Sequence, residues 1–160
     1  MSDSYSLPDQ DDVRKTLTSL LGKEVTVNAG GSALEPDCAQ PLTVAVYQDA
    51  EENTVAVCVI DLPLSSSMGA ALALIPPGVA EDCIRTSQIP ENIFENVSEV
   101  LNVCVNLFHG PSRIRLSKVL SPGNPADERT VDFCDDSEVN DHFRVSVPGY
   151  SDGRISLYLK

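Results

Sequence analysis

Apolar residues recur along the chain in helical and alternating patterns that divide its first half into four elements. In VRKTLTSLLG (13–22), Val13, Leu17, Leu20 and Leu21 share one helix face, with Asp11 or Asp12 as the cap and Gly22 as the stop. Three alternating segments then predict strands: KEVTVNA (23–29), LTVAVYQ (42–48) and NTVAVCVID (53–61). The polar DAEEN connection favours an antiparallel pairing of the second and third strands.

The second half begins with helices and ends with strands. Small apolar residues in 64–75 predict a helix that Pro76, Pro77 and Gly78 end, and 79–88 adds another turn or two. The longest predicted helix, PENIFENVSEVLNVCVNLFHG, spans 90–110, with Pro90 in its tolerated first turn and Gly110 past its end. Strands are expected at 113–120 and as a hairpin within 142–160. The order predicts an α+β fold, a mostly antiparallel sheet with the long helix and other helices packed on it.

A single domain is expected across residues 1–160, because this length can bury a sizeable core and the composition is that of a globular chain. Residues 1–10 are predicted to be flexible. The acidic, Pro- and Gly-containing segment 121–141 is predicted to be a surface excursion, with TVDFC (130–134) as a short edge strand.

Net charge and cysteine content narrow the range of functions that the chain can have. Eleven basic and 24 acidic residues give a net charge of −13, which disfavours nucleic acid and anionic membranes as partners. Five cysteines without a CxxC pair, and only two histidines, give little support for a metal site. The apolar settings of Cys58 and Cys104 favour buried, reduced thiols, and a thiol nucleophile is the alternative. No signal peptide or membrane span is visible, so a cytoplasmic protein is expected.

Four polar residues of the long helix follow steps of four, three and four: Glu95, Glu99, Asn102 and Asn106. Such a line is either an ordinary solvated stripe or a functional face. Two asparagines are poor choices for a helix that needs only solubility, because Asn competes with the backbone for hydrogen bonds. No Lys or Arg occurs between Arg85 and Arg113, which is unusual for a solvated face. The pattern therefore leaves both interpretations open.

The SEVLN stretch resembles the motif of the CheC/CheX/FliY family of chemotaxis phosphatases, in which Glu and Asn stand three apart on a long helix. Glu99 and Asn102 occupy those positions, and the order of elements around them is similar to that of CheX. A single copy of the motif makes the chain more similar to CheX than to CheC. The resemblance implies the CheX/CheC-like fold over most of the chain and hydrolysis of the aspartyl phosphate of a CheY-type receiver.

The resemblance also implies roles for particular residues. Asn102 would position the attacking water and Glu99 would orient the receiver, whose own magnesium would leave this chain without a cofactor. A partner-binding rim would comprise Glu95, Ser98, Leu101 and Asn106, and a homodimer through a sheet edge is expected. Ser98 and Leu101 replace small residues of the family motif, and the bulk of Leu101 predicts a narrowed approach to Asn102. A catalytically inactive, receiver-binding or dimerising adaptor is therefore the alternative.

Overall fold

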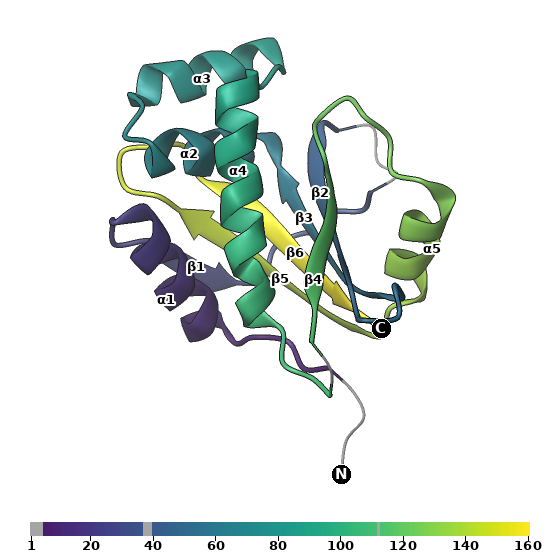
Figure 1. Cartoon of the computed structure of the whole chain (residues 1–160). Helices are drawn as coiled ribbons and strands as arrows, with labels where there is room; N and C mark the ends of the chain where they lie inside the picture. The colour runs from purple at the N-terminus through teal and green to yellow at the C-terminus, as the bar shows by residue number, and fades with distance from the viewer. Residues whose placement is uncertain (1–4, 37–39, 112) are drawn as a thin grey trace.

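One antiparallel sheet with helices on both faces forms the structure, which is a computed structural model that describes residues 5–36, 40–111 and 113–160 (Figure 1). In this described part, the six strands lie in the order β1-β5-β6-β3-β2-β4, and every neighbouring pair is antiparallel. The strands are β1 (Thr26–Ala29), β2 (Leu42–Gln48), β3 (Thr54–Asp61), β4 (Arg115–Leu120), β5 (Val139–Ser146) and β6 (Gly153–Leu159). The helices are α1 (Gln10–Leu21), α2 (Leu62–Leu72), α3 (Pro77–Thr86), α4 (Glu91–Val103) and α5 (Glu128–Asp136). The predicted α+β class and antiparallel sheet are confirmed.

The central strands are apolar on both faces, and the two faces belong to different layers. Along β2, Ala45 and Tyr47 join the main core with α1, α2 and α4, whereas Val44 and Val46 join a smaller cluster on the other face. Because strand side chains alternate, a strand that is covered on both faces is apolar at most successive positions. Helix α5 covers part of the second face through Phe133 and Cys134 (Figure 1).

Helix α2 allows α4 to approach closely because its residues are small. A Cβ on Gly69 would lie 2.6 Å from the Ile93 side chain and 2.8 Å from that of Val97. Real Cβ atoms do not approach other atoms this closely, so only glycine fits there. The Asn96 side chain donates a hydrogen bond of 2.8 Å to the Gly69 carbonyl. One face of α4 is thereby fixed against α2.

The long predicted helix ends earlier than expected. Helix α4 stops at Val103, and a 3-10 turn, η1 (Cys104–Leu107), continues it. The buried Tyr47 hydroxyl donates to the Leu101 carbonyl at 2.6 Å. This bond gives the carbonyl a partner where the α-helical pattern changes. Asn106 therefore lies on the 3-10 turn rather than on the α-helix.

Two local predictions need correction. TVDFC (130–134), expected as a short edge strand, is helical: it belongs to α5, which Asp127 caps, with Thr130 and Cys134 packed inward. The cap of α1 is Asp9, with Asp12 completing the capping box. At the N-terminus, the backbones of Ser6 and His109 are hydrogen-bonded to each other, and α1 begins at Gln10. The prediction for residues 1–4 lies outside the described residues.

Candidate functional site

The outward side of α4 carries the polar line that the sequence singles out. Glu95, Glu99 and Asn102 are exposed on the helix, and Asn106 is exposed on η1. Residues three and four apart are neighbours on a helix surface, so Glu99 and Asn102 present a carboxylate and a carboxamide side by side. The structure therefore brings the predicted pair together on one open surface.

These four side chains have no hydrogen bond or ion pair with any other part of the chain that the structure describes. Asn96, on the same helix, is instead held by the Gly69 carbonyl. Ser98 is half-buried and donates to the Phe94 carbonyl at 3.0 Å, one turn earlier. The hydroxyl of Ser98 is thus engaged within the helix, whereas Glu99 and Asn102 keep their hydrogen-bonding capacity for another molecule.

Leu101 does not belong to the exposed rim, which corrects the expectation from sequence. Its side chain is fully buried in the main core. It therefore does not narrow the approach to Asn102, although it lies between Glu99 and Asn102 in sequence. A step of one residue turns a helix by about 100°, which carries the neighbour of an exposed residue into the core.

Asn102 lies on the flank of α4 that is turned away from α2. It is six positions after Asn96, which places the two side chains about 120° apart around the helix axis. Figure 1 shows α2 on one side of α4 and the edge strand β4 on the other, and α4 and β4 are in contact. The start of β4 lies beside the C-terminal end of α4 (Figure 1).

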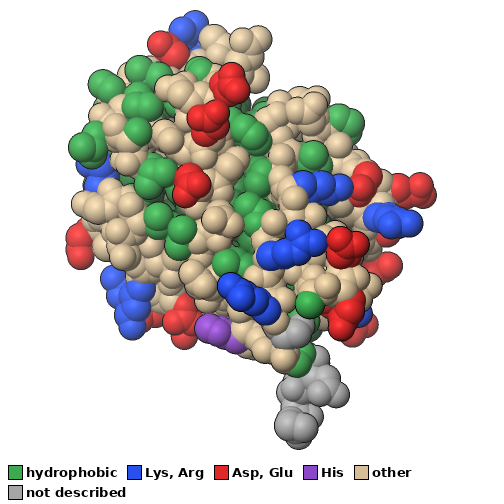
Figure 2. Space-filling model, viewed as in Figure 1, with side chains coloured by type: hydrophobic (Ala, Val, Ile, Leu, Met, Phe, Trp, Pro, Cys, Tyr) green, Lys and Arg blue, Asp and Glu red, His purple; other side chains and the backbone are tan. Residues whose placement is uncertain are grey.

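Acidic residues on α4 and basic residues on and just before β4 lie on neighbouring parts of this surface. Glu91, Glu95 and Glu99 are exposed along α4, whereas Arg113, Arg115 and Lys118 are exposed on and just before β4. Figure 2 shows acidic side chains over α4 and a row of Lys and Arg side chains over β4, with hydrophobic side chains between them. Lys118 pairs with Asp127 at 3.0 Å, and hydrogen bonds from Thr130 and then Lys118 lower the pKa of Asp127 to about 2. Arg115 lies 3.6 Å from Glu52, and Arg113 has no partner among the described residues.

Thiol chemistry finds no support in the structure. Cys58 and Cys104 are buried in the main core. Burial raises the pKa of the Cys58 thiol well above its usual value and that of Cys104 to about 12. A thiol that stays protonated and shielded from solvent is a poor nucleophile. Cys38 lies outside the described residues.

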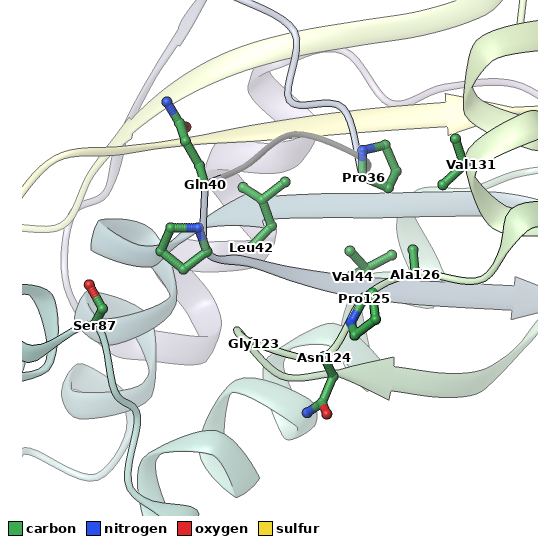
Figure 3. Close-up of a pocket in the computed structure, with 11 residues that line it drawn as sticks. Pro36, Gln40, Leu42, Val44, Ser87, Gly123, Asn124, Pro125, Ala126 and Val131 are labelled. Atoms are coloured by element: carbon green, nitrogen blue, oxygen red, sulfur yellow. The ribbon is translucent and has the colours of Figure 1, made fainter.

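A cavity of about 630 Å³ lies elsewhere, and sequence reasoning missed it (Figure 3). Its walls come mainly from Pro36, from residues 40–44 and from residues 123–131, and they include Pro41 and Pro125. Leu42 and Val44 line it from the sheet face opposite α4. Its polar lining side chains are Gln40, Ser87 and Asn124, none of which ionises near neutral pH. The clustered prolines were the available signal, but their convergence depends on the fold.

Two further findings concern metals and membranes. Within the described residues, no three His, Cys, Asp or Glu side chains come together in a way that would hold a metal ion. In the same part of the chain, no helix has both the length and the apolar character needed to cross a membrane.

Comparisons with known proteins identify the fold of this chain. No family model matches the chain, and no curated protein matches it. Among solved structures, FliM from H. pylori in complex with SpeE superimposes with a TM-score of 0.55 at 10% identity, covering 94% of this chain and 80% of that one. FliM from H. pylori in complex with FliG gives 0.53 at 10% identity, covering 94% and 86%. CheX from Vibrio vulnificus gives 0.51 at 11% identity, covering 94% and 95%.

Coverage of nearly the whole chain means that the likeness concerns the complete domain rather than a shared fragment. At these identities the likeness establishes the fold and leaves the activity to be tested. The predicted CheX-like architecture is confirmed: the chain has the fold of CheX and FliM.

Proposed function

We propose that the chain is a phosphatase for the aspartyl phosphate of a CheY-type response-regulator receiver, acting from the outward side of α4. The observation that carries the proposal is that Glu99 and Asn102 are adjacent and exposed, with no partner among the described residues. The likeness of the fold to CheX and the position of the pair in the SEVLN stretch support the same activity.

Asn102 is suited to positioning the attacking water. Hydrolysis of an acyl phosphate proceeds by in-line attack, so catalysis consists mainly of orienting the water and stabilising charge. A carboxamide donates through its nitrogen and accepts through its oxygen, so it can hold one water in a defined orientation. Because the Asn102 side chain has no hydrogen-bond partner among the described residues, both its donor and its acceptor are available when a receiver docks.

Glu99 is suited to orienting the receiver. A carboxylate on the open helix surface can pair with a lysine of the partner, which fixes the relative position of the two proteins more than it adds affinity. The receiver would supply magnesium to neutralise its phosphoryl group. The residues assigned to catalysis in this chain are then limited to Glu99 and Asn102.

The test is the decay of phosphate from the CheY-class receivers encoded in the same genome, with and without the protein. We expect the wild type to accelerate decay and Asn102→Ala to lower that acceleration by about 100-fold, as expected when a positioned reactant is lost. Asn92→Ala is a matched control, because Asn92 is an exposed asparagine on the same helix, about 15 Å along the axis from Asn102. Absence of acceleration with every such receiver contradicts the proposal.

A second candidate function is a receiver-binding adaptor without turnover. The observation that favours it is the likeness to FliM, whose solved structures include complexes with FliG and with SpeE. An adaptor would bind a receiver loaded with beryllofluoride, a mimic of the phosphorylated state, and would leave the decay of phosphate unchanged. Measuring binding and decay on the same receiver separates the two functions.

A further inference from the structure

The C-terminal end of α4 is an unfavourable place for a phosphoryl group unless cations stand beside it. Asn102 lies near this end, where the helix dipole is negative, and the Glu99 carboxylate is exposed one turn before it. The chain as a whole carries a net charge of −13. All three contributions repel a phosphorylated, acidic partner that approaches Asn102.

The cations that flank this end of α4 lie on and just before the edge strand. Arg113 and Arg115 are exposed at the start of β4, beside the C-terminal end of α4 (Figure 1, Figure 2). Asn102 is exposed one residue before the end of α4, and the start of β4 lies beside that end of the helix (Figure 1). A partner that reaches Asn102 therefore also comes close to the start of β4.

These cations differ in whether they are bonded within the chain or are available to a partner. Lys118 is committed to Asp127, the cap of α5, at 3.0 Å. Arg115 meets Glu52 only at 3.6 Å, and both side chains are more than half exposed. Arg113 has no partner among the described residues. Exposed pairs such as Arg115–Glu52 contribute little to folding, so Arg115 can exchange its partner at low cost.

We propose that Arg113 and Arg115 form a cationic contact that, together with the acidic row of α4, docks the acidic side of the phosphorylated receiver. The proposal rests on the proposed function for the identity of the partner. Glu95 and Glu99 would face basic groups of the receiver, while Arg113 and Arg115 would face the carboxylates around its phosphorylated aspartate. A surface with one acidic and one basic side fixes the orientation in which the partner docks, because the reversed orientation brings like charges together.

The test measures binding of a beryllofluoride- and magnesium-loaded receiver from the same genome to the full chain, over a series of salt concentrations. Arg113→Glu removes no described intramolecular bond, so it is expected to fold normally. Arg144→Glu is the matched control: Arg144 is also exposed and has no partner among the described residues, and it lies on β5, several strands from β4. Both variants change the net charge by the same amount, so any difference between them reports position rather than total charge.

We expect Arg113→Glu to weaken binding about fivefold at low salt relative to Arg144→Glu, with the difference shrinking as salt rises. Equal affinities of the two variants would overturn the docking contact and leave the phosphatase proposal standing. Weaker binding of Arg113→Glu without any turnover by the wild type would support the contact and refute the phosphatase. Failure of the wild type to bind any loaded receiver would overturn both.

Discussion

The two sides of α4 differ in what holds their polar residues. On the inner side, Asn96 bonds to the Gly69 carbonyl, and Ile93 and Val97 pack where a glycine leaves room. On the outer side, Glu99 and Asn102 are exposed and have no partner among the described residues. One helix thus carries an asparagine that stabilises the fold and another that the fold does not use. The second is the one available for a partner.

Substitutions on the two sides of α4 should therefore have different effects on stability and on activity. Those on the inner side are expected to lower the free energy of unfolding, and those on the outer side to leave it nearly unchanged.

Leu101→Ala is expected to cause the largest loss, about 2–5 kcal/mol, because its side chain is fully buried and its removal leaves a cavity. Chemical denaturation monitored by circular dichroism measures the change. A loss below about 1 kcal/mol would place Leu101 at the surface, and the earlier expectation that it narrows the approach to Asn102 would regain support.

Gly69→Ala should cost about 1–3 kcal/mol, because the new Cβ would collide with Ile93 and Val97 and force α2 and α4 apart. Gly78→Ala is the control: it lies in α3 with no atom within 4 Å of the added Cβ. The control is expected to be neutral or slightly stabilising. Equal effects of the two substitutions would show that α2 and α4 are not in close contact at Gly69.

Asn96→Ala and Asn102→Ala compare the two asparagines directly. Loss of the bond to the Gly69 carbonyl should cost about 1 kcal/mol at Asn96. The change at Asn102 should stay within about 0.5 kcal/mol, as at most exposed positions. If Asn102→Ala destabilised the protein as much as Asn96→Ala, its side chain would serve the fold, and its proposed role toward a partner would lose its basis.

The smallest response is expected from thiol reagents at Cys58 and Cys104. The pKa of Cys104 is raised to about 12 by burial, so at pH 8 the group is protonated as well as shielded. Native protein treated with iodoacetamide, digested and analysed by mass spectrometry should show these two sites unmodified while unfolded protein shows them labelled. Rapid labelling of either site in the native protein would support the alternative hypothesis of a cysteine nucleophile.

Local patterns predicted much of the fold, because most helices and strands contain periodic apolar residues and many are bounded by Gly or Pro. The errors came where tertiary contacts decide. Segment 121–141 has an acidic composition, yet Phe133 and Cys134 pack on the second face of the sheet and hold it as α5. Near the end of α4, the Leu101 carbonyl accepts a hydrogen bond from Tyr47, a residue 54 positions earlier in the sequence.

The candidate site was predictable to a similar extent. The spacing of Glu99 and Asn102 placed them on one face, and the structure agrees. The bonding of Asn96 could not be predicted, because it requires knowing that Gly69 lies against this helix. The inward direction of Leu101 could be predicted from the periodicity, since it lies eight residues beyond Ile93 and four beyond Val97 on the buried face.

The most direct test of the central claim is the rate of receiver dephosphorylation at saturating protein, compared between Asn102→Ala and Asn96→Ala. If the outer side of α4 carries the chemistry, Asn102→Ala loses about 100-fold in rate with its stability intact. Asn96→Ala, although less stable, keeps a rate close to that of the wild type wherever it is folded. Full activity of Asn102→Ala would contradict the assignment of the water-positioning role to Asn102.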